Sequence, residues 1–217
     1  LVQEAQDALL RDLGRAAPNE ERGVVLRVLS ARGSADAHLV SLADQAAFDL
    51  VVVGQRRHSI LEELWYGSVA RGVLRASPVS VASVPAASSV KAAAYRPPRV
   101  VVVATDFTEI GDRAIAQAMG SVVPGGTVHL VHVVPFITSS KTEAQEAREQ
   151  ARRVLAEQRV GDAEHFARLE RHVLEGAAAE QLLAFSDRIG ADLLVLGAHP
   201  ARPTWQSPDA VHVLLRD

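Results

Sequence analysis

The chain has 217 residues, a length that allows one large domain or two small ones. Hydrophobic residues make up 48% and charged residues 23%, which is ordinary for a packed globular protein and excludes a disordered chain. A net charge of −3 gives no electrostatic reason to expect nucleic acid, and the absence of cysteine excludes disulfides, thiolate zinc sites and cysteine nucleophiles.

Membrane insertion and secretion are not expected either. No apolar run approaches the roughly 18–20 residues that cross a bilayer. The N-terminus reads as a charged helix and not as a signal peptide. We therefore expect a cytoplasmic protein with no membrane partner.

The first half of the chain alternates helical and strand patterns. The apolar periodicity predicts helices at 2–17, 34–47 and 61–75, and strands at 23–30, 50–53 and 79–84. The run at 50–53 is continuous and apolar, which is typical of a strand buried on both faces. Residues 85–98 are rich in Ala, Ser and Pro and have no periodic face, so they are interpreted as a linker.

The same alternation restarts after residue 98. We predict strands at 100–103, 127–134, 168–174, 193–196 and 211–215, and helices at 109–120, 142–158 and 177–189. Strands that alternate with helices of this length indicate parallel βαβ units. Val52, Val102, Val131 and Val195 are expected to be almost fully buried.

The two halves are related by an internal repeat. With an offset of 143 positions, residues 33–54 align without a gap to 176–197, and 8 of 22 positions are identical. The strand–helix–strand segment at 100–134 has no counterpart in the first half. Because the sequence also opens in mid-helix and has Met119 as its only methionine, we expect its beginning to be missing.

The second half is shorter than the repeat predicts near its end. Eleven residues, 198–208, include three prolines, whereas a helical crossover between parallel strands needs about a dozen residues or more. Either the strand at 211–215 pairs in another way or the sequence skips a loop, and we favour the skipped loop.

The predicted fold class is α/β, with two tandem doubly wound parallel-sheet domains. The first domain covers residues 1–84, the linker 85–98 and the second domain 99–217. In such sheets, ligands bind beyond the carboxyl ends of the strands, where the strand order reverses.

Two segments resemble the universal stress protein family. VVVATDFTEIGDRAIAQA followed by TVHLVHVVP resembles the opening of a universal stress protein domain, and VVVGQRRHSILEELWYGSVARGVLRASPVSVASVP resembles its closing third. The resemblance covers nearly the whole chain as two tandem domains, the first truncated. It implies a nucleotide-binding, adenine-hydrolase-like fold.

The closing segment carries most of a phosphate-binding signature. By the resemblance, Gly54, Gly67 and Ser68 fit it, with Val69 beside them, whereas Arg57 stands where a second glycine is expected. Glycine lets backbone N–H groups approach a phosphate, and a helix N-terminus adds a favourable dipole. Ser68 is equally consistent with an ordinary helix N-cap. Arg57 either pairs with phosphate or is a solvated loop charge, and we favour the second.

The opening segment supplies the other half of a site. By the resemblance, Asp106 contacts the ribose or the adenine and Val133 contacts the base edge. Asp106 can also cap the turn into the following helix. Gly197 ends the strand at 193–196, but His199 and Pro200 follow it with no Gly-Ser pair. Neither half shows a complete site.

Signs of catalysis are lacking. G-x-S-x-G, H-E-x-x-H and G-x-x-x-x-G-K-[ST] are absent. His129 and His132 lie three apart on a strand, so they face opposite sides and cannot share a metal. The other histidines are interpreted as surface or core residues, and no metal site is predicted.

The resemblance therefore implies a non-enzymatic regulatory module that binds ATP or a related adenine nucleotide weakly, with at most one site per chain. The alternative is an interaction module of the same fold without nucleotide binding, and a nucleotidyl-transfer enzyme is less favoured. The resemblance also implies that the last strands of the two domains pair antiparallel and form a pseudo-dimer, and a homodimer is a further expected partner state. The valines on those strands are Val79, Val81, Val84, Val211 and Val213.

Overall fold

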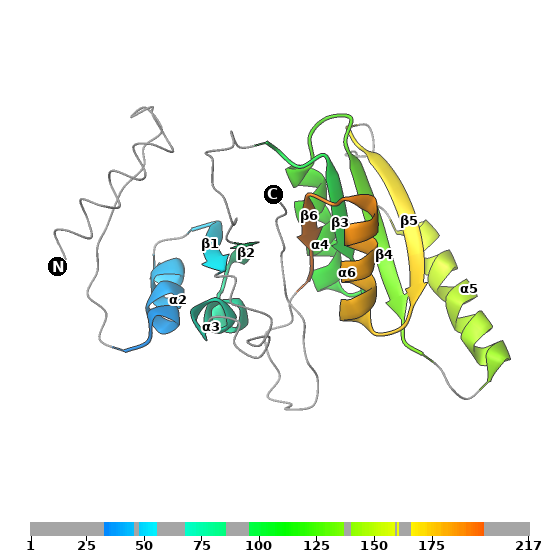
Figure 1. The fold of residues 1–217 in the computed structure, drawn as a ribbon, viewed down its shortest axis with the longest axis horizontal. Helices are drawn as coiled ribbons and strands as arrows, with labels where there is room; N and C mark the ends of the chain where they lie inside the picture. The colour runs from blue at the N-terminus through cyan, green and yellow to red at the C-terminus, as the bar shows by residue number, and fades with distance from the viewer. Residues whose placement is uncertain are drawn as a thin grey trace.

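The computed structural model shows two units that each combine parallel strands with helices (Figure 1). The structure describes residues 33–45, 48–55, 68–85, 96–136, 140–158, 160 and 166–197. The expected helix at 2–17, the expected strands at 23–30 and 211–215, Arg57 and Gly67 lie outside these residues. Across the described ranges, no helix has both the length and the apolar character needed to cross a bilayer.

The first unit contains a two-stranded parallel sheet. Its elements in chain order are α2 (Ala35–Gln45), β1 (Leu50–Gln55), α3 (Ser68–Ala76) and β2 (Ser80–Pro85). β1 pairs with β2 along its whole length, from Leu50 opposite Ser80 to Gln55 opposite Pro85. The two strands are parallel and joined through α3, as the alternating pattern predicted.

Among the described residues, packing contacts cover only one face of β1. Val51 and Val53 lie against Leu39 of α2 and Val73 of α3. Val52 points to the opposite face, because successive side chains of a strand alternate, and it is 61% exposed. The prediction that Val52 is almost fully buried is therefore wrong. A strand is buried on both faces only when helices cover both faces of its sheet. The described helices of this unit, α2 and α3, pack on one face of β1.

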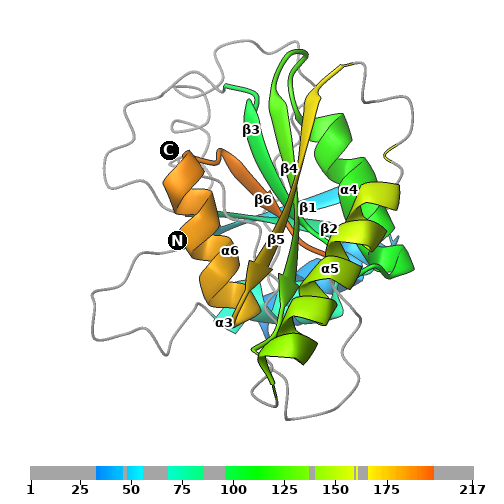
Figure 2. The same ribbon diagram turned by 90° about the vertical axis from the view of Figure 1, so that its right-hand side faces the viewer.

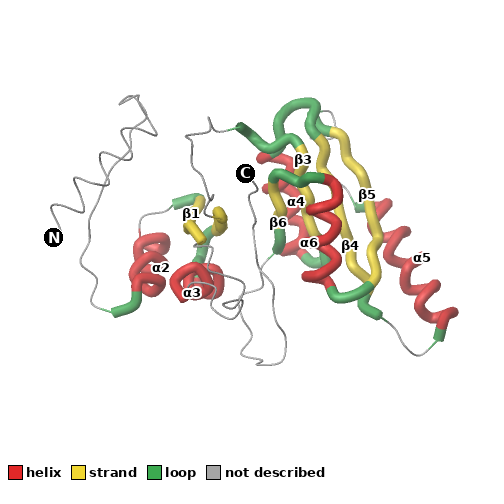
Figure 3. Tube along the Cα trace, in the orientation of Figure 1, coloured by secondary structure: helices red, strands yellow, loops and turns green. Residues whose placement is uncertain are grey.

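The second unit is a four-stranded parallel sheet with the strand order β5-β4-β3-β6 (Figure 3). Its elements are β3 (Val100–Ala104), α4 (Glu109–Ser121), β4 (Thr127–Val134), α5 (Lys141–Glu157), β5 (Arg168–Glu175), α6 (Ala178–Ile189) and β6 (Leu193–Val195). The predicted bounds of these seven elements agree with the structure to within about one residue, whereas the predicted strand at 211–215 lies outside the described residues. The chain runs outward from β3 through β4 to β5 and then returns to the other side of β3, which is the doubly wound arrangement predicted from the sequence.

Helices cover both faces of this sheet (Figure 2). α4 and α5 pack on one face, where Ile115 and Leu155 meet Val101 and Val103. α6 packs on the other face, where Phe185 meets Val102. The predicted burial of three central valines is confirmed, with exposed fractions of 0% for Val102, 0% for Val131 and 7% for Val195.

A carboxylate joins the starts of β3 and β6. Oδ2 of Asp192 accepts hydrogen bonds from the backbone N–H groups of Arg99 and Val100, each at 2.9 Å. The backbone N–H of Asp192 donates to the carbonyl oxygen of Val100 at 2.8 Å. α6 ends just before this point at Gly190, whose φ of 65° is the left-handed conformation that glycine adopts readily. These contacts set the register of β6 against β3.

The burial of β4 can be tested with one substitution. Leu130 is 0% exposed and belongs to the core on the α4 and α5 face. Leu130→Ala should therefore lower the free energy of unfolding by about 2–5 kcal/mol, measured by urea denaturation. Leu183→Ala on α6 is the control, because Leu183 is 43% exposed and its loss should change stability by less than about 0.5 kcal/mol. Equal losses in the two variants would contradict the packing described here.

Candidate functional site

The carboxyl edge of the second sheet brings three predicted site residues to one side of the molecule. β3 ends shortly before Asp106, β6 ends shortly before Gly197, and Val133 is near the end of β4. These strands are parallel neighbours in the order β4-β3-β6, so their carboxyl ends share one edge. The strand order reverses between β3 and β6, which is where open α/β sheets bind ligands.

Asp106 closes the turn between β3 and α4. Its Oδ1 accepts hydrogen bonds from the backbone N–H of Thr108 at 3.0 Å and from the hydroxyl of Thr108 at 2.6 Å. Thr108 in turn is the N-cap of α4 and accepts from the backbone N–H of Gly111. The capping interpretation of Asp106 is therefore realised. The residue itself is exposed to solvent at the edge where a ligand would bind.

The turn that carries Asp106 has an unusual backbone. Phe107 has a φ of 63°, a left-handed conformation that bulky residues rarely adopt. The Phe107 ring stacks on the His132 ring, with centroids 4.3 Å apart, and Nδ1 of His132 is 2.8 Å from the carbonyl oxygen of Thr105. Contacts with β4 thus hold the turn in place, and strain of this kind is often found at ligand sites.

Gly197 lies against the first turn of α4. A Cβ built on Gly197 would be 2.9 Å from Cγ2 of Ile110 and 3.1 Å from the Ile110 carbonyl oxygen. Only glycine fits this close approach without a shift of the helix or of the segment after β6. Val133 is partly buried and packs with the core beneath α6, so its side chain has a structural role. The backbone N–H and C=O groups of Val133, and not its side chain, therefore suit the expected contact with the edge of a base.

The predicted phosphate residues belong to the first unit. Gly54 is exposed near the end of β1, and an added Cβ there would meet nothing within 4 Å. Ser68 begins α3, and Val69 packs against the core of the first unit. No acidic residue lies in the first turn of α3, whereas Glu109 and Asp112 lie in the first turn of α4. Of these two helix starts, that of α3 is therefore better suited to a phosphate.

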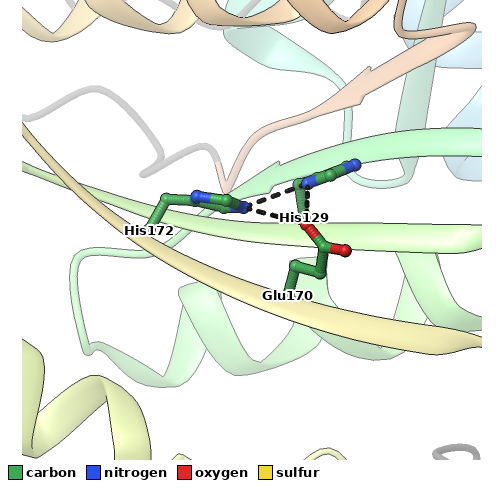
Figure 4. Close-up of side chains that lie close together, drawn as sticks. All are labelled: His129, Glu170 and His172. Carbon is green, nitrogen blue, oxygen red and sulfur yellow. Dashed lines mark hydrogen bonds and ion pairs between the residues drawn. The ribbon is translucent and has the colours of Figure 1, made fainter.

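A group of polar side chains that the sequence analysis did not connect lies on the α6 face of the sheet (Figure 4). His129 comes from β4, and Glu170 and His172 come from β5. Nδ1 of His129 is 3.0 Å from Nε2 of His172 and 3.5 Å from Oε2 of Glu170. Nε2 of His172 is 3.8 Å from the same carboxylate oxygen. The predicted separation of His129 from His132 is confirmed, since His132 stacks on Phe107 and His129 contacts His172.

Burial lowers the pKa of His129 and of His172 below the usual value for histidine, although the Glu170 carboxylate opposes this effect. Both rings are therefore harder to protonate than a free histidine. The group could have been anticipated only from the alternation of Glu170 and His172 on one face of β5, together with the register of β5 against β4.

Comparison with known proteins identifies the class of protein to which this doubly wound sheet belongs. The model of the universal stress protein family matches residues 1–85 and 98–205, and the chain belongs to this family. A search of curated proteins finds no significant match.

Solved universal stress proteins share the fold. One from Archaeoglobus fulgidus DSM 4304 is 20% identical, covers 98% of this chain and 75% of its own, and has a TM-score of 0.62. One from Pseudomonas aeruginosa UCBPP-PA14 is 17% identical over 96% of this chain and 77% of its own, with a TM-score of 0.61. A universal stress protein solved in complex with cAMP is 20% identical over 46% of this chain and 76% of its own. Its TM-score is 0.36.

The close approach of Gly197 to Ile110 can be tested by measuring protein stability. Gly197→Ala should lower the free energy of unfolding by about 1–3 kcal/mol, because its Cβ would overlap Ile110. Gly120→Ala in α4 should instead raise it by about 0.5–1 kcal/mol, since a Cβ there meets nothing and alanine favours the helix. Thermal and urea denaturation of both variants measure the difference. A Gly197→Ala protein as stable as the parent would show that the two segments are not in contact.

Proposed function

We propose that the chain is a non-enzymatic regulatory universal stress protein that binds an adenine nucleotide weakly, with one site per chain. The observation that carries the proposal is the convergence of Asp106, Val133 and Gly197 at the edge where the strand order of the second sheet reverses. The exposed carboxylate of Asp106 suits the hydroxyl groups of a ribose. The main chain of Val133, near the end of β4, suits the polar edge of a base.

The phosphate half of the site is weaker in the second unit. Glu109 and Asp112 in the first turn of α4 repel an anion at that helix start. His199 and Pro200 follow Gly197 where a Gly-Ser pair would be expected. The first unit has the better phosphate residues in Gly54 and Ser68. Neither unit therefore has every part of a nucleotide site among its described residues, which is the physical reason to expect low affinity.

The ribose contact can be tested with an isosteric change. Asp106→Asn keeps an oxygen that accepts from Thr108 and removes the negative charge. We expect the dissociation constant for ATP to rise about tenfold, because hydrogen bonds to charged groups are worth about 1–2 kcal/mol more than neutral ones. Isothermal titration with ATP, AMP and cAMP measures the dissociation constants. The affinity for inorganic tripolyphosphate, which has no ribose, should be the same in the parent and in Asp106→Asn.

Asp187→Asn is the matched control for this experiment. Asp187 lies in the last turn of α6, at the edge where β6 begins, so the same change in charge should leave ATP affinity unchanged. Equal effects of the two substitutions would show that only the net charge matters. ATP hydrolysis by the purified parent protein above the spontaneous rate would overturn the non-enzymatic part of the proposal.

A second test asks whether the phosphates of the bound nucleotide reach the loop of the first unit that carries Arg57. If the Arg57 side chain excludes phosphate, Arg57→Gly should tighten ATP binding by about tenfold, since an unpaired backbone amide forfeits roughly 1–3 kcal/mol. If the Arg57 guanidinium holds the phosphate, the same change should weaken binding in a salt-dependent way. Titration at two salt concentrations distinguishes these results. Binding that is unaffected by the change would place the phosphate elsewhere.

The second candidate function is an interaction module that has lost its nucleotide. Arg57 in place of a glycine and the missing Gly-Ser pair after Gly197 favour it. Failure of the parent, Arg57→Gly and Asp106→Asn proteins to bind any of the nucleotides would overturn nucleotide binding and support this second function.

A further inference from the structure

We propose that His129, Glu170 and His172 form a binding site for a divalent transition metal of the zinc type, independent of the nucleotide edge. The three side chains offer two imidazole nitrogens and one carboxylate oxygen, a ligand set that zinc and its neighbours accept. With water in a fourth position, these donors would complete a four-coordinate site.

The separations of the three donor atoms fit such an ion. Nδ1 of His129, Nε2 of His172 and Oε2 of Glu170 are the corners of a triangle with sides of 3.0, 3.5 and 3.8 Å. The centre of the circle through these three atoms lies about 2.0 Å from each of them. This distance matches the metal–nitrogen and metal–oxygen distances of zinc sites. The three donor atoms are therefore already spaced as such an ion requires.

The backbone holds the donors in this arrangement. β4 and β5 are paired along eight residues, with His129 directly opposite Glu170 and Val131 opposite His172. Glu170 and His172 are two residues apart, so they share a face of the sheet with His129. Sites built on paired strands are held more rigidly than sites on loops.

Neighbouring side chains orient the ligands. The Phe185 ring of α6 lies beside both imidazoles, with centroids 5.8 Å from His129 and 4.8 Å from His172. Nε of Arg168 is 3.0 Å from Oε1 of Glu170, so the guanidinium engages one oxygen while the other faces the histidines. The His129 side chain is 10% exposed, whereas those of Glu170 and His172 are 33% and 29% exposed, which provides a path for the ion.

Two features oppose metal binding. The metal must replace the proton shared between the two imidazoles, so the ring that now donates must carry its hydrogen on its other nitrogen. Arg168 on β5 and Arg188 on α6 also place positive charge close to the cluster. We therefore expect electrostatic repulsion from these arginines to lower the affinity for the metal, and we expect substitution of an arginine to raise it.

The site is separate from the proposed nucleotide edge. His129 precedes Val133 by four residues of β4, a distance of about 13 Å along an extended strand. The cluster also lies on the packed face beneath α6, whereas Asp106 and Gly197 lie at the ends of strands. Failure of one proposal leaves the other unaffected.

The test uses the full chain and ZnCl₂ in competition with a chromophoric chelator. We expect one zinc ion per chain whose affinity falls at least tenfold in His172→Gln and in Glu170→Gln. His132→Gln is the matched control, since His132 is on the same strand but faces the other side, and it should keep the parent affinity. Arg188→Gln should raise the affinity severalfold because it removes repulsion.

Two further readouts define the ligands. Cobalt bound to the parent should show the absorption of a four-coordinate site, and this signal should be lost in Glu170→Gln. MgCl₂ should neither compete with zinc nor raise the melting temperature, since magnesium binds poorly to imidazole. If His172→Gln does not fold, as judged by circular dichroism, Glu170→Gln decides the test, because Glu170 is partly exposed. Zinc binding of equal affinity in the parent, Glu170→Gln and every other folded variant would overturn the proposal and assign the ion to adventitious histidines.

Discussion

Pairing of β3 with β4 on one side and with β6 on the other is the constraint on which the second unit depends. β3 is covered by helices on both faces, and Val101, Val102 and Val103 are 0% exposed. Because the chain returns to β3 only after passing through β4 and β5, this pairing joins segments that are far apart in the sequence. The bond from the backbone of Arg99 to Asp192 spans 93 positions. The same pairing makes the ends of β3 and β6 neighbours, and so makes Asp106 and Gly197 part of one edge.

The sheet supports two polar regions of different physical character. The carboxyl edge is built from turns, and its geometry depends on contacts such as that of Gly197 with Ile110. The cluster of His129, Glu170 and His172 is built on paired backbone instead, so its geometry depends on the register of β4 and β5. A ligand at the edge meets turns that side-chain contacts hold in place. An ion in the cluster must accept the spacing that the strands impose.

Much of the second unit could be predicted from the sequence, because continuous valine runs indicate buried strands and the apolar face of an amphipathic helix indicates which side packs on the core. The same rule failed at Val52, since the sequence of a strand does not show whether a helix covers its second face. Asp106 and Gly197 could be assigned to an edge because parallel strands end together. The histidine cluster could not be found by spacing within one strand. Its members meet only through the pairing of β4 with β5, and a shift of that register by one residue would separate them.

The left-handed turn at Phe107 couples the parts of the candidate edge mechanically. Its ring rests on His132, the residue immediately before Val133, and the His132 imidazole also contacts the backbone of Thr105. This stacked pair therefore connects the end of β4 to the turn that carries Asp106. The residues proposed to contact the base and the sugar therefore belong to one connected unit and not to two independent loops. Loss of the stack would disturb both of these proposed contacts together.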